Sequence, residues 1–466
     1  MEIEQVRRYL TKKIHGRQVN KILHSFPSPR LWKDPTGGCK EVMLEQSDAS
    51  RKSSTAEMEL YVSLPFCIPT KPSHCGYCLF PVEDYKNSSQ LINYLDYLKR
   101  EGELYAPFHQ DYDPISVYIG GGTPNLLKAE HYGPLMDIIR TNFPNMSADT
   151  PITLEGIPQL FFRGKIEALA NHGYTRISMG AQQLNERLTK FSGRKQKPEH
   201  IFNAIKWARE FGLESNVDLI FGWPQQTKEI MLDDLNKLID TGISHITHYE
   251  LNIGGPTPFS LERRDELPGI EEVKELYHLS RELLLNNGYV QLTSYDFEKR
   301  ESEPAGKFIY EECRRNYDHR EVWGWGYAAI SDFPSLNDEG GWTFMNHRNL
   351  KAYYDAIDRK AIPVESSFQR QQIDLKLALI FRNLQSLRVD RESYRRRFSQ
   401  DVVDDFRNIW TGLQEFGLVE VDDDYIRLTN DGGYYVPLMQ TLLSKERVEE
   451  LVDRQYSRSQ GLAVIQ

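Results

Sequence analysis

The stretch from Leu60 to Phe80 reads LYVSLPFCIPTKPSHCGYCLF and holds three of the five cysteines of the chain. It begins as a β-type run, which Cys67, Cys75 and Cys78 then follow. Seven residues separate the first two cysteines and two separate the last pair. Three clustered thiols favour a metal site, because thiols of cytosolic proteins stay reduced and rarely form disulfides.

The number of ligands decides which metal this stretch favours. A closed zinc site takes four protein ligands, and the obvious fourth candidate, His74, adjoins Cys75 in the sequence. Neighbouring side chains seldom reach one tetrahedral centre together. Three cysteines alone leave one position open, which suits an iron–sulfur cluster that binds a small molecule at its remaining iron. The residues therefore favour a cluster, with structural zinc and unligated thiols as alternatives.

Composition excludes several functional classes. The chain has 466 residues, with 57 Lys plus Arg against 67 Asp plus Glu. Its net charge of −10 argues against nucleic-acid binding, which normally needs a basic surface. The N-terminus lacks the apolar core of a signal peptide, and no run of about 18 apolar residues predicts a membrane span. We therefore expect a cytoplasmic protein with neither nucleic-acid nor membrane partners.

Short β-branched runs alternate with longer segments of helical periodicity between residues 59 and 294, which is typical of parallel βα units. The predicted strands cover residues 59–64, 115–119, 151–155, 175–179, 215–220, 245–251 and 289–294. The predicted helices cover residues 88–105, 128–142, 159–172, 199–211, 227–241 and 270–287. Six or seven such units predict an α/β fold built on a partial (β/α)6 TIM-like barrel.

We predict four segments along the chain. They are an N-terminal extension with a polar linker (1–57), the barrel core (58–300), a further extension (301–364) and a C-terminal domain (365–466). In the C-terminal domain, a pair of helical segments precedes a pair of β-like runs, which resembles a winged-helix α+β domain. The hairpin tip Asp422–Asp424 is acidic and does not suit DNA, so this domain is interpreted as a lid or packing element.

Polar or glycine-rich residues follow the predicted strands, at the ends where barrel enzymes carry their active sites. Glycines 120–122 follow the second strand, and a backbone without side chains can expose its amides to a ligand. Glu155 ends the third strand, and Gln182 and Arg194 follow the fourth. Asp218 lies in an apolar strand, where a carboxylate is costly unless it is paired or solvated. Their recurrence predicts one central active site.

Two further groups of residues allow only less specific interpretations. Trp323, Trp325 and Tyr327 alternate and could form a substrate platform, although such aromatic stripes are more often core. Cys39 and Cys313 are interpreted as unligated thiols.

The chain resembles a radical S-adenosylmethionine (SAM) enzyme, of the branch that contains oxygen-independent coproporphyrinogen III oxidase. That branch places cysteines spaced CxxxCxxC after a strand reading Tyr-x-His-x-Pro-Phe, and the matching residues here are Tyr61, Pro65, Phe66, Cys67, Cys75, Tyr77 and Cys78. The first cysteine gap is seven residues instead of three, and Ser63 stands where most of the branch has His. Extending the gap from three to seven residues adds roughly 0.7 kcal/mol to the cost of closing the loop, which is small beside metal–thiolate bonding.

The resemblance implies a set of roles. The cluster is a 4Fe–4S cluster bound by Cys67, Cys75 and Cys78. One or two molecules of SAM are expected to contact Gly121, Gly122, Thr123, Glu155, Gln182, Arg194 and Asp218. The residues expected to be catalytic are Tyr61, Gln182 and Asp218. The implied partners are a small-molecule substrate and an electron donor such as flavodoxin or ferredoxin.

The resemblance implies reductive cleavage of SAM to a 5′-deoxyadenosyl radical, followed by one of three outcomes. The oxidase signature adds a cysteine two residues after the third, and this position is Phe80 here. We therefore predict methyl or methylene transfer to a specialised metabolite. The alternatives are oxidative decarboxylation of coproporphyrinogen III in haem biosynthesis and haem handling by a chaperone without oxidase activity.

Overall fold

The computed structural model describes residues 1–18, 24–33, 39–52, 57–109, 112–300, 321–333 and 340–463. The chain forms two compact units. The barrel unit comprises residues 34–336 and 343–367, and the C-terminal unit comprises residues 1–33, 337–342 and 368–466. The domain boundaries expected at residues 57, 300 and 364 stay predictions, and Cys313 lies outside the described residues.

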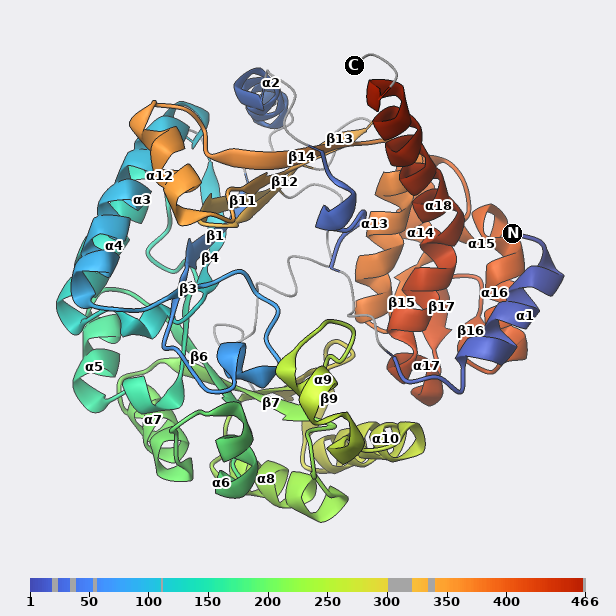
Figure 1. The fold of residues 1–466 in the computed structure, drawn as a ribbon, viewed down its shortest axis with the longest axis horizontal. Helices are drawn as coiled ribbons and strands as arrows, with labels where there is room; N and C mark the ends of the chain where they lie inside the picture. Colours follow the sequence, from blue (N-terminus) through green and yellow to red (C-terminus); the bar gives the residue numbers. More distant parts are fainter. Residues whose placement is uncertain are drawn as a thin grey trace. The chain divides into compact units, whose positions relative to one another are not determined.

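Six parallel strands form the centre of the barrel unit. They pair side by side in chain order: β1 (Glu57–Leu64), β4 (Asp113–Gly121), β5 (Ile152–Gly156), β6 (Arg176–Gln182), β7 (Glu214–Phe221) and β8 (His245–Glu250). Six helices lie around the outside of these strands (Figure 1): α3 (Ser88–His109), α4 (Tyr132–Asn142), α5 (Arg163–Asn171), α7 (Pro198–Glu210), α8 (Lys228–Asp240) and α10 (Ile270–Asn286). The predicted partial (β/α)6 barrel is confirmed.

The sheet extends beyond these strands at both ends. At one end β10 (Asp296–Lys299) pairs antiparallel with β8, and β9 (Tyr289–Gln291) pairs antiparallel with β10. The strand predicted at 289–294 therefore runs in the same direction as β8 but does not pair with it, because β10 lies between the two strands. At the other end β11 (Glu321–Gly326) runs parallel to β1. The sheet continues through β12 (Ile330–Phe333), β13 (Gly341–Asn346) and β14 (Val364–Arg370).

One expectation near the barrel needs correction, and another is confirmed. The polar linker predicted up to residue 57 begins as helix, because α2 runs from Cys39 to Lys52. Trp323 and Trp325 are fully buried on β11, and Tyr327 is 3 % exposed. These aromatic side chains are core, which is the interpretation that the sequence favoured, and they do not form an open platform. None of the described helices combines the length and apolar character that a membrane crossing needs.

Glu101 ties α3 to β11 inside the barrel unit. Its buried carboxylate accepts hydrogen bonds from the Gly326 N–H (2.7 Å), the Asn346 amide (2.7 Å) and the Tyr353 hydroxyl (2.5 Å). Tyr353 lies on α12 (Leu350–Asp358). Burial outweighs these bonds and raises the pKa of Glu101 to about 8. Three donors around one carboxyl group fix the position of β11 beside β1.

The C-terminal unit is an α+β arrangement, as predicted. Its antiparallel sheet has the order β15 (Arg388–Asp390), β17 (Tyr425–Leu428), β16 (Val419–Val421). Its helices are α13 (Gln372–Gln385), α14 (Arg391–Phe398), α15 (Val402–Asp405), α16 (Arg407–Glu415), α17 (Asn430–Tyr434) and α18 (Val436–Ala463). Helix α1 (Ile3–Lys13) packs on α16 through Val6 and Leu10, so the first residues of the chain complete this unit.

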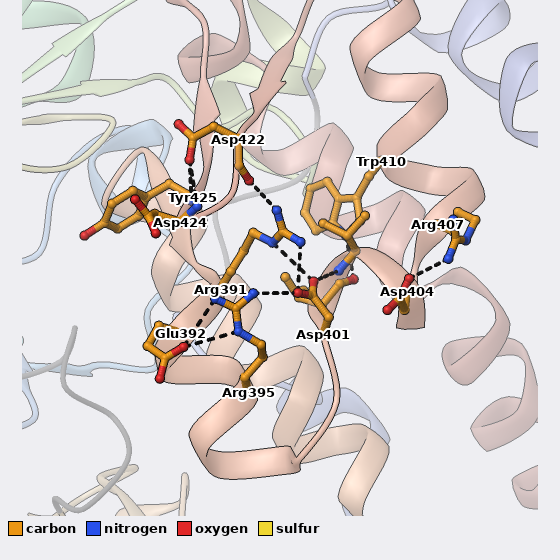
Figure 2. Close-up of polar contacts among 12 residues, drawn as sticks. Arg391, Glu392, Arg395, Asp401, Asp404, Arg407, Trp410, Asp422, Asp424 and Tyr425 are labelled. Atoms are coloured by element: carbon orange, nitrogen blue, oxygen red, sulfur yellow. Dashed lines mark hydrogen bonds and ion pairs between the residues drawn. The ribbon is translucent and has the colours of Figure 1, made fainter.

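Asp401 organises the polar contacts of this unit (Figure 2). Its carboxylate accepts from Arg391 Nη2 (2.9 Å), Arg395 Nη1 (2.8 Å) and the Val403 N–H at the start of α15 (2.8 Å). Arg391 also donates to the Asp422 carbonyl at the tip of the β16–β17 hairpin. Burial opposes ionisation, but the arginines and the Val403 N–H outweigh it and hold the pKa of Asp401 below its ordinary 3.8.

We predict that Asp401→Ala destabilises the C-terminal unit locally by about 2–3 kcal/mol, because two arginines and a helix N-terminus lose their shared acceptor. Hydrogen–deuterium exchange across α14–α16 measures this as lost protection. Since folding lowers the pKa of Asp401, its contribution is present above about pH 4 and is lost as pH falls through the folded value. The control Asp404→Ala removes a carboxylate whose side chain is 63 % exposed, so it is expected to cost under about 0.5 kcal/mol. Equal losses in the two variants would contradict the role of Asp401.

Candidate functional site

The cysteine loop begins where β1 ends, and backbone hydrogen bonds hold it against the glycine turn. The Gly122 N–H donates to the Leu64 carbonyl (2.7 Å), and the Thr123 N–H donates to the Phe66 carbonyl (2.8 Å). A Cβ on residue 122 would lie 2.6 Å from the Phe66 carbonyl oxygen, so only glycine permits this approach. Gly121 has φ +106°, which also requires glycine. The two predicted segments therefore meet.

Each of the three cysteine sulfurs has a hydrogen-bond donor near it. Thr123 Oγ1 lies 3.4 Å from Cys67 Sγ, Arg194 Nη1 lies 4.0 Å from Cys75 Sγ, and the Phe80 N–H lies 3.4 Å from Cys78 Sγ. Burial raises the pKa of the Cys67 thiol to about 11, and the neighbouring thiols reinforce the shift. Donors of this kind stabilise sulfur that has become thiolate on binding a metal.

The donor set fits an iron–sulfur cluster. Among the described residues, no three His, Cys, Asp or Glu side chains converge closely enough to hold one metal ion. Thiolates that bind separate irons of a cluster stand farther apart than ligands that share one ion. The thiols of Cys67, Cys75 and Cys78 still lie close enough to influence one another's charge, and His74 beside them is exposed.

Contacts within and around the long cysteine gap give it a defined conformation. Thr70 Oγ1 accepts from the Cys75 N–H (2.9 Å) and donates to the Pro72 carbonyl (2.8 Å), which closes the loop on itself. Gly193 packs against it so closely that a Cβ there would lie 2.4 Å from the Lys71 carbonyl oxygen. The residues of the long cysteine gap therefore have a fixed conformation and form part of the site.

Aromatic side chains anchor the second half of the loop. The Tyr77 ring lies 5.1 Å from that of Trp223 and 6.0 Å from that of Phe259, both of which are buried. Gly76 has φ +80°, and a Cβ there would lie 2.4 Å from the Phe259 ring. Tyr77 thus serves as a hydrophobic anchor between the last two cysteines.

Tyr61 and Glu155 come together next to the glycine turn. A Cβ on Gly120 would lie 2.7 Å from Glu155 Oε2 and 3.1 Å from the Tyr61 hydroxyl. The Tyr118 hydroxyl donates to Glu155 Oε1 (2.6 Å), and the Tyr118 ring stacks on that of Tyr61. Burial raises the pKa of Glu155, while bonds from Tyr118 and the Gly121 amide oppose the rise. The carboxylate is therefore held in place before a ligand arrives.

Asp218 faces the interior of the barrel, as predicted for a carboxylate in an apolar strand. The Asn216 amide donates to its Oδ1 at 2.6 Å. Burial, reinforced by the charge of Glu155, raises the pKa of Asp218 to about 7, and the charge of Arg176 opposes the rise. The group consequently changes charge near neutral pH.

Gln182 is the last residue of β6, and Arg194 lies beyond the end of that strand. Gln182 has φ 68° at a register shift in the pairing of β6 with β7. Arg194 donates to the Gly180 carbonyl and, through Nε, to Gln196 Oε1 (2.8 Å), while its Nη1 points toward Cys75. Arg194 therefore links the end of β6 to the cysteine loop.

Sequence reasoning missed a polar network deeper in the barrel. Arg176 Nη2 lies 2.7 Å from His245 Nδ1, and Thr247 Oγ1 donates to Asp296 Oδ1 (2.9 Å). The signal was present as polar residues at every second position of the strands, such as Arg176 with Ser178 and Asn216 with Asp218. These positions share the inner face, because side chains alternate along a strand.

The structure thus brings the predicted metal, glycine-turn and carboxylate residues to the same end of the strands. Their roles as ligands and catalysts stay predictions. Cys39 lies on α2, away from the cysteine loop in sequence, and is half-buried.

Comparisons with known proteins agree with this arrangement. The family model described as Radical SAM superfamily matches residues 72–238. Oxygen-independent coproporphyrinogen III oxidase from Helicobacter pylori (strain ATCC 700392 / 26695) is 26 % identical over 428 residues, which cover 89 % of this chain and 93 % of the relative. Heme chaperone HemW from Escherichia coli (strain K12) is 30 % identical over 243 residues, which cover 52 % of this chain and 63 % of the relative.

A solved structure shows the same fold. The structure described as "Coproporphyrinogen III oxidase (HemN) from Escherichia coli is a Radical SAM enzyme" has a TM-score of 0.76 and 22 % identity, and the match covers 92 % of this chain and 99 % of that one. Residues 72–238 match the radical SAM superfamily, and over 89 % of its length the chain is similar to an oxygen-independent coproporphyrinogen III oxidase, so the cysteine loop is that of a radical SAM domain with a 4Fe–4S cluster and SAM as cofactors.

Proposed function

We propose that the chain is a radical SAM oxidase whose first candidate reaction is the oxidative decarboxylation of coproporphyrinogen III. The observation that carries this proposal is the extent of the similarity. Coproporphyrinogen III oxidases from Helicobacter pylori and Escherichia coli (strain K12) match 89 % and 88 % of this chain, so the resemblance continues past the barrel into the C-terminal unit.

Residues of the cysteine loop would hold the cluster. A bound cluster would supply one electron for the reductive cleavage of SAM to a 5′-deoxyadenosyl radical. Cys67, Cys75 and Cys78 would bind three irons, and Cys67 would release its proton on metal binding, because metal ligation requires the thiolate. Thr123 and Arg194 donate toward sulfur and would stabilise the charge that reduction adds.

Residues at the strand ends would orient SAM. Arg194 offers a guanidinium to the carboxylate of the cofactor, and the turn from Gly121 to Thr123 lets a ligand approach the backbone. Glu155 and Asp218 provide partly exposed carboxyl groups for the cationic and hydroxyl-bearing parts of SAM. Enclosure by the strands would exclude water from the reacting atoms.

Transfer of a methyl or methylene group remains the second candidate, and Phe80 is the observation that favours it. This residue occupies the position of the extra cysteine of the oxidase signature, and its side chain is 53 % exposed. Ser63, which replaces the usual His, is buried against the glycine turn. Both departures lie beside the cysteine loop, where they would alter the reaction without altering radical formation.

The first prediction concerns the product. Anaerobically reconstituted protein with SAM, dithionite and coproporphyrinogen III is expected to form 5′-deoxyadenosine and decarboxylated porphyrinogen, measured by liquid chromatography with mass spectrometry. Formation of S-adenosylhomocysteine together with a methylated product would establish carbon transfer and contradict the oxidase proposal. Haem binding, seen as a Soret band, without turnover would place the chain with the chaperones.

The second prediction concerns the cluster ligands. Single Ser variants of Cys67, Cys75 and Cys78 are expected to lose most of their iron and sulfide and the broad absorption near about 400 nm, because oxygen is a poor substitute for thiolate sulfur. The matched control is Cys39→Ser, which is expected to keep the wild-type iron content. Iron retained in all three loop variants, or zinc in the wild-type protein, would refute the cluster assignment.

The third prediction concerns Asp218. Its carboxylate forms as pH rises through about 7, so SAM affinity is expected to rise roughly three- to ten-fold between pH 6 and pH 8 through attraction to the sulfonium. Asp218→Asn should remove this rise while the cluster absorption stays unchanged. Isothermal titration calorimetry at several pH values measures it. An unchanged pH profile in the variant would show that Asp218 does not contact the cofactor.

A further inference from the structure

Two segments near the cysteines carry positive charge without any acidic residue. Residues 68–80 and 187–198 together contain six Lys and Arg and no Asp or Glu. The whole chain has a net charge of −10. Glu186 and Glu199 border the second segment, and Glu83 and Asp84 lie opposite Phe66 and Cys67, so the positive charge is confined to these two segments.

The two segments lie side by side in the barrel unit. Gly193 packs on the Lys71 backbone, with a would-be Cβ 2.4 Å from the Lys71 carbonyl oxygen and 2.9 Å from its nitrogen. The turn Ser73–Gly76 contacts the turn Lys190–Ser192. Arg194 reaches from the second segment to within 4.0 Å of Cys75 Sγ. The positive charge is therefore gathered beside the cluster ligands.

Three lysines of these segments are available to a partner. Lys71, Lys190 and Lys195 are exposed, and none of them forms an ion pair with any residue in the described part of the chain. Some other exposed lysines of the barrel unit are paired instead: Lys237 with Asp233 and Lys351 with Asp355. Unpaired cations on one face create an attractive potential for an anionic partner.

Apolar side chains that adjoin the cluster ligands in the sequence are exposed as well. Ile68 follows Cys67 and is 42 % exposed, while Leu79 and Phe80 follow Cys78 and are 40 % and 53 % exposed. An apolar centre with a charged rim is the usual composition of a protein–protein interface. Because the apolar residues adjoin the cluster ligands in sequence, a partner seated on them would come close to the cluster.

We propose that this face, formed by Ile68, Lys71, Leu79, Phe80, Lys190 and Lys195 and called the donor face, docks a small acidic one-electron carrier protein. The inference rests on the proposed radical chemistry, which requires a one-electron reductant. In the step the carrier loses one electron and the cluster gains it, with no bond or proton transferred. The residues of the long cysteine gap thus recruit the reductant through Lys71 and Ile68.

The electrostatic contribution to this docking predicts a salt-dependent association. The charge-reversal variant Lys71→Glu/Lys190→Glu/Lys195→Glu is expected to bind reduced flavodoxin at least about ten-fold more weakly than wild type at an ionic strength of about 0.02 M. The difference should shrink at about 0.3 M, because screening shortens the reach of the charges. Calorimetry gives the affinity, and stopped-flow bleaching of the cluster gives the rate of electron transfer.

The matched control is Lys99→Glu/Lys206→Glu/Lys360→Glu, which changes the net charge equally at exposed lysines away from the two segments. It is expected to bind flavodoxin as wild type does. Phe80→Ser tests the apolar centre and should weaken binding by about three- to ten-fold at both salt concentrations, since burial of apolar surface is not screened.

Reduction with dithionite distinguishes failure of the donor-face proposal from failure of the proposed function. This small reductant needs no docking, so both triple variants should cleave SAM with dithionite at the wild-type rate. Equal flavodoxin affinity in the two triple variants would overturn the donor face. A raised KM of the donor-face variant for the organic substrate under dithionite would also overturn it, because the lysines would then serve substrate capture. If wild-type protein fails to cleave SAM with dithionite, the radical proposal fails, and the calorimetric comparison still decides whether the face binds an acidic carrier.

Discussion

Strand β1 is the constraint on which the site depends, because it is held on both sides by parallel neighbours. Its residues pair with β11 on one side and β4 on the other. The chain leaves β1 at Leu64 and stays hydrogen-bonded to the glycine turn through the Leu64 and Phe66 carbonyls. The cysteines consequently start from a fixed point. Buried Glu101, which binds β11 and α12 together, supports the outer side of the same strand.

Several ionisable groups lie inside the barrel, away from water. Removing such groups from water is costly unless they are paired. Glu155 is held by Tyr118 and Gly121, Asp218 by Asn216, and Arg176 lies against His245. Burial dominates the shifts of both carboxyl groups: it raises the pKa of Glu155, and it raises the pKa of Asp218 to about 7. A cationic ligand in this space would supply the missing counter-charge, and its binding would favour the ionised carboxylates.

The strands and helices of the barrel were predictable because each has a strong local pattern. Apolar runs mark β4 and β7, and the helices between them show clear helical periodicity. The antiparallel strand β10 between β8 and β9 was not predictable, because the residues of β9 do not show which strand pairs with it. The pairing of β11 with β1 joins residues more than 250 positions apart, and no local pattern encodes it.

The residues of the candidate site likewise fall into those that the sequence predicted and those that it did not. Cys67, Cys75 and Cys78 were found because their spacing is a chemical signal, and Asp218 because a carboxylate in an apolar strand is anomalous. Arg176 and Asn216 were missed because each looks like an ordinary polar residue until alternation along the strand is considered.

The long cysteine gap shows how a loop can gain residues without disturbing what it holds. Thr70 bonds to both Pro72 and Cys75, so the inserted residues close on themselves and the second cysteine stays in place. Gly193 lacks a side chain and leaves room for the Lys71 backbone against the following turn. Because the loop is fixed at these points, its outward side chains are free to vary without cost to the fold. The added length therefore changes the surface beside the cluster ligands, while the bonds from Thr123 and Arg194 toward sulfur remain.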